Sequence, residues 1–301
     1  TFERRIGNCA PGGEPAQSGE PCSVPLYRSQ SGFRANTTTR NIAVFGQADF
    51  ALAGNLSALA GARLQYEEIT YEGARTDERV VDGDLPLPGF APSSGSGKSD
   101  DTVLTGKVGL QYEFSDVSQT YLTWSTGYKG AGYEIEFASV FENQQPIQPE
   151  EAKAWELGFK AQLLDGLLTL NSALFHAEYQ DLQVQANRGD PELDIVRFAT
   201  TNAGRATTQG VELEFAFRPL DGWSLSGGAT YLDGSVDIDG LNCPLSERAA
   251  APVIAGPHPI NVCYRPTATA APIQNVRDGS LPSSPKWRGN LTARYDFDVP
   301  G

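Results

Sequence analysis

The chain has 301 residues, with 23 Lys and Arg against 37 Asp and Glu, a formal net charge of -14 and a pI near 4.6. This acidity argues against a nucleic-acid partner, because phosphate binding requires a concentrated basic surface. The mean hydropathy of -0.33 and the lack of any apolar run of about 18 residues exclude a transmembrane helix, but not a transmembrane β-barrel. The 32 Gly and 20 Pro favour short strands and turns, so we expect an all-β fold.

The first 40 residues are rich in Gly, Pro and Ser, and we expect them to form a loop. Cys9 and Cys22 lie in this stretch, and Cys243 and Cys263 lie in a second stretch rich in Pro. Loop-stapling disulfides in an oxidising compartment are favoured over free thiols, which stay the alternative. Neither pair has the CxxC spacing of a zinc site. The chain begins without Met or an apolar signal, as expected of a fragment.

From residue 41 onward, apolar and polar residues alternate in about nine segments. In residues 102–115, for example, Val108 and Leu110 share one parity, while Lys107 and Gln111 share the other. Such alternation predicts strands with one apolar and one polar face. The segments are residues 41–52, 55–68, 102–115, 119–133, 151–164, 166–186, 194–218, 222–236 and 284–297.

The connections between these segments alternate in length along the chain. The short ones, "AG", "SDV", "D" and "PLD", alternate with residues 69–101, 134–150, 187–193 and 237–283. Short periplasmic turns and long extracellular loops are typical of outer-membrane barrels, whereas a soluble sandwich shows no such alternation. This layout makes residues 1–40 an extracellular loop and residues 41–297 the strands of one barrel domain.

Aromatic residues of the apolar parity fall near the two ends of the predicted strands. Near the short turns lie Phe50, Phe114, Phe217, Trp223 and Phe297, and near the long loops lie Tyr66, Tyr128, Trp155, Tyr231 and Trp287. Two aromatic girdles are expected where a barrel crosses the two membrane interfaces. The apolar parity then faces lipid and the polar parity faces a wet lumen, unless these rings instead fill a soluble core.

Several stretches resemble the barrel of TonB-dependent outer-membrane receptors, in the order in which that family has them. They are "NIAVFGQADFAL", "LSALAGARLQYE", "QTYLTWSTGYKGAGYE", "PEEAKAWELGFKAQLLDGLLTLNSALFHAEYQDLQV", "TNAGRATTQGVELEFAFRPLDGWSLSGGATYLDG" and "LPSSPKWRGNLTARYDF". The resemblance implies an antiparallel up-and-down transmembrane barrel in the outer membrane of a Gram-negative cell. About nine strands would be part of a barrel of about 22 strands. Their odd number predicts that the isolated segment aggregates unless its remaining strands pair with it.

The same resemblance implies the function. It predicts active import of a ferric siderophore or a similar large nutrient, energised through the TonB complex, which contacts a plug domain outside this chain. The expected partners are outer-membrane lipid, TonB and the ligand, and no nucleic acid. No cofactor is expected, because the ferric chelate is the transported ligand.

Arg and Tyr in the expected loops are candidates for contacting an anionic or aromatic ligand such as a ferric catecholate. These candidates are Tyr27, Arg28, Tyr71, Arg75, Tyr133, Arg188, Tyr264 and Arg265.

Catalytic and metal motifs are weak in this sequence. "PSSGSGKSD" lacks the first Gly of a phosphate-binding loop, since Pro92 stands there, and "DGSVDIDG" lacks the end residues of a calcium loop. His176 and His258 have no nucleophile motif nearby. We therefore expect neither an enzyme nor a resident metal.

Two other functions stay open. A passive porin-like channel would share the strand pattern, and a soluble β-sandwich binding module would bury the apolar parity. The second alternative requires that Val44, Leu110, Leu213 and Leu291 pack together in a dry interior.

Overall fold

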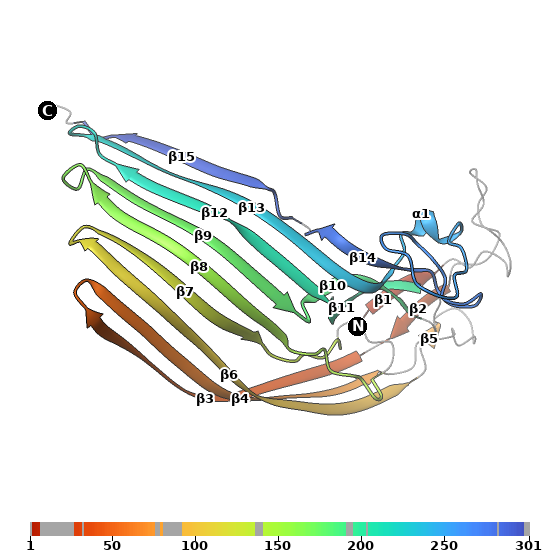
Figure 1. The fold of residues 1–301 in the computed structure, drawn as a ribbon. Coiled ribbons are helices and arrows are strands. Elements are labelled where there is room, and N and C mark those ends of the chain that lie inside the picture. The colour runs from red at the N-terminus through yellow and green to blue at the C-terminus, as the bar shows by residue number, and fades with distance from the viewer. Residues whose placement is uncertain are drawn as a thin grey trace, which may run out of the picture.

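A computed structural model describes residues 2–6, 27–31, 33–75, 79–80, 92–135, 141–190, 195–202, 204–281 and 283–297. Within them one curved antiparallel sheet of ten strands dominates (Figure 1). The all-β antiparallel prediction is confirmed. Cys9 and Cys22 lie outside the described residues.

Most strands of the main sheet pair with their neighbours in the sequence. Along the sheet the order is β14-β13-β12-β9-β8-β7-β6-β4-β3, and β15 also pairs with β13. The strands are β3 (Phe33–Ala53), β4 (Leu56–Arg75), β6 (Ser93–Ser115), β7 (Ser118–Lys129), β8 (Glu150–Leu163), β9 (Leu168–Gln180), β12 (Arg205–Phe217), β13 (Trp223–Asn242), β14 (Ile273–Ser280) and β15 (Trp287–Tyr295). This is an up-and-down meander, as expected for a barrel wall.

The four predicted short turns lie at one end of the sheet (Figure 1). They span residues 54–55, 116–117, 164–167 and 218–222. Gly54 and Gly222 have positive φ, of 55° and 78°, which glycine adopts without strain. The longer connections leave from the opposite end, where we place the extracellular side.

Three strands extend further to the extracellular side than the alternation predicts. β3 begins at Phe33 rather than at residue 41, β4 runs on to Arg75, and β6 begins at Ser93, so the predicted loop boundary at residue 40 is wrong. Polar residues occupy both parities there, as in "RANTTTR", because both faces of a strand are wet beyond the membrane. Periodicity therefore cannot detect these extensions.

Two predicted segments proved too long, and one strand of the main sheet was not predicted. Asp181 and Gly204 both have positive φ and end the β9–β12 ladder at the same level. Between them β10 (Gln183–Asp190) and β11 (Ile195–Asn202) form a separate hairpin. β14 lies in a stretch predicted as a loop, and it pairs with the extracellular half of β13, while β15 pairs with the other half.

Short elements complete the described structure. β1 (Phe2–Ile6), β2 (Tyr27–Ser31) and β5 (Arg79–Val80) form a three-stranded sheet, and α1 (Leu245–Arg248) lies between β13 and β14. Among the described residues, no helix is long and apolar enough to cross a membrane.

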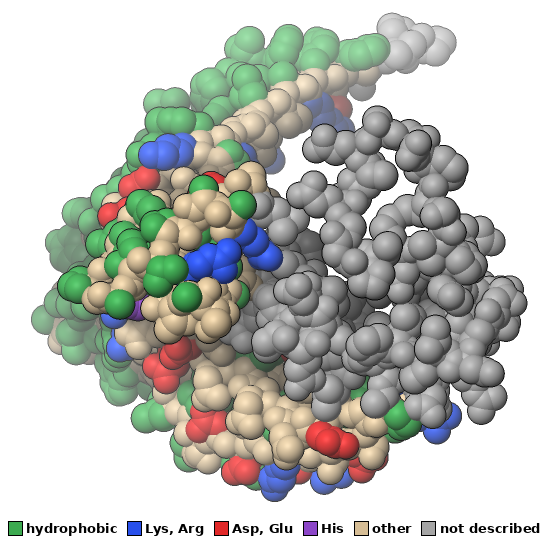
Figure 2. All heavy atoms as spheres, turned by 90° about the vertical axis from the view of Figure 1, so that its right-hand side faces the viewer, with side chains coloured by type: hydrophobic (Ala, Val, Ile, Leu, Met, Phe, Trp, Pro, Cys, Tyr) green, Lys and Arg blue, Asp and Glu red, His purple; other side chains and the backbone are tan. Residues whose placement is uncertain are grey.

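The apolar parity lies on the exposed, convex side of the sheet. Val44 is 69% exposed, Leu110 49%, Leu213 41% and Leu291 72%, so these side chains form no dry interior. In Figure 2 the hydrophobic side chains gather on the outside of the curved wall. This is the arrangement of a lipid-facing surface, and it is the opposite of that of a soluble sandwich.

Candidate functional site

The polar parity forms a mostly hydrophilic surface on the inner side of the wall, interrupted by Phe45, whose ring lies under the Arg63 guanidinium. One row of directly opposed positions crosses five strands from β6 to β12 and is polar at each of them. The row contains Glu113, Gln119, Lys160, Asn171 and Glu214. Such a row requires water on that side, so this face lines a hydrated lumen.

Neighbouring side chains on this inner surface satisfy one another. Arg63 donates from Nε and Nη2 to Gln65 Oε1 at 2.9 and 2.7 Å, and Gln65 donates to Glu67 at 3.2 Å. Gln111 donates to Glu113 at 3.2 Å and to Gln119 at 2.8 Å. Because these groups are already hydrogen-bonded to one another, the polar inner surface offers few free groups to bind a solute strongly.

Tyr121 lies flat against the inner surface of the wall. Its hydroxyl donates to Glu156 Oε1 at 2.7 Å, and Lys160 Nζ lies 5.5 Å from the centre of its ring. The ring crosses Gly158, the position directly opposite on β8, where any Cβ would overlap it. Aromatic cover over a strand glycine fixes the register and leaves a smooth lumen wall.

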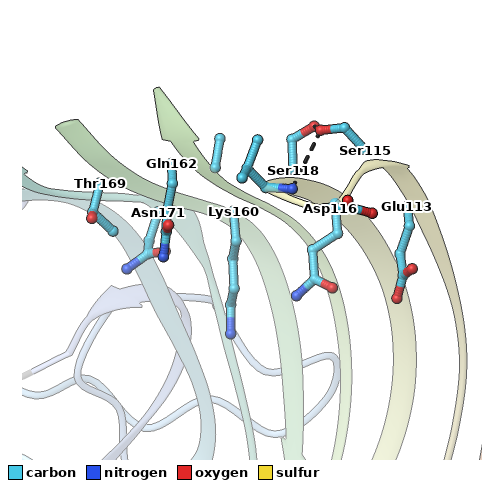
Figure 3. A pocket seen from close by; sticks show the side chains of 11 residues that line it. Glu113, Ser115, Asp116, Ser118, Lys160, Gln162, Thr169 and Asn171 are labelled. Carbon is cyan, nitrogen blue, oxygen red and sulfur yellow. Dashed lines mark hydrogen bonds between the residues drawn. The ribbon is translucent and has the colours of Figure 1, made fainter. Parts of the chain in front are cut away.

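The polar row opens into a depression of about 540 Å³ beside two of the short turns (Figure 3). Its floor includes Lys160, Asn171 and Glu113, and Ser115 Oγ lies 2.9 Å from Ser118 Oγ at its edge. These residues show no nucleophile with an adjacent base. The depression provides polar contacts rather than catalytic groups.

At the extracellular end, Tyr71 and Phe141 form a buried contact. Phe141 is 0% exposed and Tyr71 is 1% exposed. The Tyr71 hydroxyl donates to the Phe141 carbonyl at 3.0 Å, and Ser93 Oγ accepts from the Phe141 amide at 2.7 Å. A Cβ on Gly73 of β4 would overlap the Phe141 ring, and a Cβ on Gly95 of β6 would overlap the Phe141 carbonyl. These two glycines therefore form the hollow in which Phe141 sits.

Tyr133 packs on Tyr71 from the loop after β7, with ring centroids 4.5 Å apart. Burial, and then the neighbouring Tyr71, raises the pKa of the Tyr133 phenol. The group is therefore a neutral hydroxyl at physiological pH. It can stack or form hydrogen bonds with a ligand, but it does not offer a phenolate.

A second buried cluster lies between β13 and β14. Cys243 and Cys263 are joined by a disulfide with their Cα atoms 5.8 Å apart, the pairing expected from the sequence. Tyr264 is 1% exposed, and its hydroxyl lies 2.6 Å from His258 Nδ1. Arg265 donates to the carbonyls of Ala270 and Arg248, each at 3.1 Å. We call this part, residues 243–272, the disulfide lobe.

The structure thus separates the eight predicted ligand contacts. Tyr71 and Tyr264 are buried, and they and Arg265 form hydrogen bonds within the protein. Tyr133 is partly exposed beside Tyr71, and Arg75 ends β4 opposite Ser93. Tyr27 and Arg28 lie in β2 opposite Ile6 and Arg5, and Arg188 lies in β10 opposite Arg197. As ligand contacts, all eight residues stay predictions.

Phe141, which was not predicted from the sequence, attaches the loop after β7 to β4 and β6. The sequence contains a signal for this contact, since Gly73, Gly95 and Gly97 lie on the same face of β4 and β6 and allow a close approach of other chain atoms.

The two weak motifs of the sequence both lie within strands. Gly97, Lys98 and Ser99 lie within β6, and Asp233, Asp237 and Asp239 lie within β13. Among the described residues, no group of three His, Cys, Asp or Glu side chains is placed to bind a metal.

One charged pair stands on the outer face directly above the predicted aromatic girdle. Lys98 Nζ lies 2.6 Å from Glu68 Oε2, and Arg40 lies 3.9 Å from the same carboxylate. The hydrogen bond from Lys98 lowers the pKa of Glu68, and the same bond raises the pKa of Lys98. Glu68, Lys98 and Arg40 are among the first charged side chains above Tyr66 on the outer face of these strands. The apolar band of the outer face therefore ends at the level of Tyr66. At the same height Tyr128, predicted as a girdle residue, lies 3.4 Å from Asp101 instead.

An apolar outer face, a polar inner face and ten antiparallel strands with short turns at one end define a segment of an outer-membrane β-barrel wall. Comparison with known families identifies which kind. The model of the TonB dependent receptor-like β-barrel matches residues 10–301, and the chain belongs to this family of Gram-negative outer-membrane barrels. The family is one of transport receptors and not of enzymes.

Curated relatives carry receptor names. The chain is 29% identical over 150 residues to the probable TonB-dependent siderophore receptor PiuA of Acinetobacter baumannii, covering 48% of this chain and 19% of that protein. It is 27% identical over 201 residues to the pesticin receptor of Yersinia pestis, covering 66% of this chain and 26% of that protein. The chain therefore spans between about a fifth and a quarter of the length of these relatives.

Solved structures agree on the fold. The ferric yersiniabactin uptake receptor FyuA from Yersinia pestis matches with a TM-score of 0.63 and 18% identity, covering 91% of this chain and 35% of that chain. The ferric-catecholate import receptor Fiu of E. coli in its closed form matches with a TM-score of 0.55 and 16% identity, covering 93% and 35%. At these identities the likeness shows the barrel architecture alone.

Proposed function

We propose that this chain forms part of the wall and mouth of a receptor that imports a ferric siderophore or a similar large iron chelate, energised through TonB. The observation that carries the proposal is the two-faced wall, apolar on its outer side and polar on its inner side, in a chain of the TonB-dependent receptor family. The names of the relatives, a siderophore receptor and a ferric-pyoverdine receptor among them, support the choice of a ferric chelate.

In this proposal the extracellular loops capture the ligand, a plug domain rearranges under force transmitted by TonB, and the ligand crosses the lumen. The inner surface of the wall keeps the lumen hydrated and binds the passing ligand only weakly. Lys160 contacts the Tyr121 ring, and Gln111 is bonded to its polar neighbours, so a passing ligand meets groups that already have partners. Bond chemistry is not part of this function.

Tyr133 is the ligand contact that the structure supports best among the candidates. Its ring is partly exposed and is backed by Tyr71, which makes it a rigid aromatic platform. A neutral phenol suits stacking on an aromatic chelate or a hydrogen bond to it. Arg75, at the end of β4, adds a positive charge for an anionic ligand.

The test is uptake of radioactive iron by cells that carry or lack the complete gene, under iron limitation and with a panel of siderophores. We expect one chelate to be taken up only when both the gene and TonB are present. Uptake that persists without TonB would support a passive channel instead, and no effect on any chelate would contradict iron import.

A pair of variants tests the contact residue within the same assay. Tyr133→Ala should weaken apparent ligand affinity about tenfold, since stacking and one hydrogen bond contribute about 1 to 2 kcal/mol. Tyr133→Phe should keep most of the affinity. Tyr66→Ala, an aromatic loss on the outer face, is the matched control and should leave affinity unchanged; equal losses in both alanine variants would remove Tyr133 from the binding site.

A further inference from the structure

The wall is split on its extracellular side between β6 and β7. The β6–β7 ladder ends at the pair of Lys107 and Ser125, whereas β6 continues to pair with β4 as far as Ser93. The extensions of β3, β4 and β6, at residues 33–40, 69–75 and 93–101, therefore form a ribbon without ladder bonds to β7. We call them the extracellular ribbon, and it leaves the rest of the sheet in Figure 1.

Two described stretches of the loop after β7 reach across this split. Residues 130–135 and 141–149 are joined to each other by Gly132 and Ile147, which exchange two backbone hydrogen bonds of 3.1 and 2.7 Å. We call these two stretches the brace. Paired in this way, the two described stretches lie side by side at Gly132 and Ile147.

On the ribbon side the brace ends in the buried Phe141 contact. The Phe141 ring fills the glycine hollow, its amide is bonded to Ser93 of β6, and its carbonyl is bonded to Tyr71 of β4. The Tyr71 hydroxyl also accepts from the Gln144 amide at 3.3 Å. One tyrosine hydroxyl thus fixes two backbone groups of the brace to the ribbon.

On the other side the brace is bonded to the β10–β11 hairpin. Gln148 and Asn202 bond in both directions: the Gln148 amide donates to Asn202 Oδ1 at 2.8 Å, and Asn202 Nδ2 donates to the Gln148 carbonyl at 2.8 Å. Gln183 Nε2 donates to the carbonyls of Gly130 at 2.8 Å and Gln148 at 3.0 Å. Glu134 accepts from the Thr200 amide at 2.6 Å. Polar contacts therefore join the brace to both strands of the hairpin.

We propose that the brace is a mechanical coupler, so that the ribbon and the hairpin open and close as one unit around the row formed by Lys107 and Ser125. Above that row the β6–β7 ladder is absent among the described residues, and two side-chain bonds supplement the brace there: the Gly106 amide donates to Thr126 Oγ1 at 2.9 Å, and the Tyr128 hydroxyl donates to Asp101 Oδ2 at 3.4 Å. Breaking the Phe141 contacts with the ribbon therefore loosens the hairpin, and breaking the Asn202 hydrogen bonds with the brace loosens the ribbon. This coupling is independent of what the receptor transports.

Hydrogen exchange followed by mass spectrometry tests the coupling in the complete receptor in lipid nanodiscs without ligand. Tyr71→Phe keeps the ring and removes the hydroxyl with both of its hydrogen bonds to the brace. It should raise exchange in peptides of β10 and β11 at least about fivefold, the factor corresponding to a loss of about 1 kcal/mol. Phe141→Ala should raise it further. Asn202→Ala should raise exchange in peptides 93–101 and 141–149, the reciprocal result.

Tyr66→Phe is the matched control. It removes a hydroxyl from the same strand, but from the outer face, where the nearest partner is Glu68 at 3.5 Å. It should change exchange in neither region. The proposal is overturned if each of the three variants changes exchange only on its own side of the brace, or if Tyr66→Phe produces the same distant change as Tyr71→Phe.

Discussion

The wall and the extracellular region of this chain differ in where they put their large apolar side chains. In the wall, Val44, Leu110 and Leu291 are between 49% and 72% exposed, and the polar parity lines the interior. In the extracellular region, Phe141, Tyr71 and Tyr264 are at most 1% exposed, packed on glycines or beside a disulfide. The difference shows that lipid surrounds the outer face of the wall, whereas water surrounds the extracellular region. Lipid stabilises the exposed apolar face of the wall, and water drives burial above it.

The largest effect should come from removing a buried ring above the membrane. Tyr264→Ala leaves a cavity in the disulfide lobe and removes the partner of His258. It should destabilise the lobe by about 3 to 5 kcal/mol. Protease cleavage within residues 243–272, measured on the folded complete receptor, would report the loss. Tyr231→Ala, an aromatic loss on the outer face, should leave the cleavage rate unchanged.

The disulfide should contribute slightly less to the same lobe. Cys243 and Cys263 are separated by 20 residues, and closing a loop of that length stabilises the folded state by about 3 kcal/mol. The double variant Cys243→Ser and Cys263→Ser should therefore raise cleavage within the lobe and leave the denaturant midpoint of the barrel unchanged. A fall in the barrel midpoint would mean that the two regions do not unfold separately.

A charge placed on the lipid face tests the other side of the comparison. Leu110→Lys sets an ammonium in the apolar band between its middle and its rim, at a cost of about 2 kcal/mol in reversible unfolding from lipid vesicles. Gln111→Lys is the adjacent position on the lumen face, where an ammonium can donate to Glu113 and Gln119 as the amide does. It should cost less than about 0.5 kcal/mol. Equal costs would mean that the two faces are not in different solvents.

The same difference explains what could be predicted from the sequence. Alternation predicted the spanning parts of β4, β6 and β8 because lipid on one face and water on the other impose a period of two. It failed at residues 33–40 and 93–101, where water lies on both faces, and at β14, which follows a loop. Tyr71 and Tyr264 carry the residue type of a ligand contact. Only the packing of Phe141 and the position of His258 show that both side chains are buried and bonded within the protein.

The smallest expected effect concerns the charged pair at the upper edge of the lipid-facing band. Glu68 has a lowered pKa because Lys98 donates to it, so its contribution to stability is present above its unfolded value near 4.5 and is lost as pH falls through the lower folded value. Lys98 has a raised pKa, so its contribution is present below about 10.5 and is lost as pH rises through the higher folded value. Both groups are exposed, and solvent screens them.

Lys98→Gln should therefore change exchange in residues 67–70 only slightly between pH 5 and 9, and not at all below the folded pKa of Glu68, after correction for intrinsic exchange. Adding salt should reduce the difference, since exposed ion pairs are screened within about 10 Å at 0.1 M. A large, salt-independent effect would show that this pair is shielded from water. The apolar band would then extend above Tyr66, and the boundary between lipid and water would lie within the extracellular ribbon.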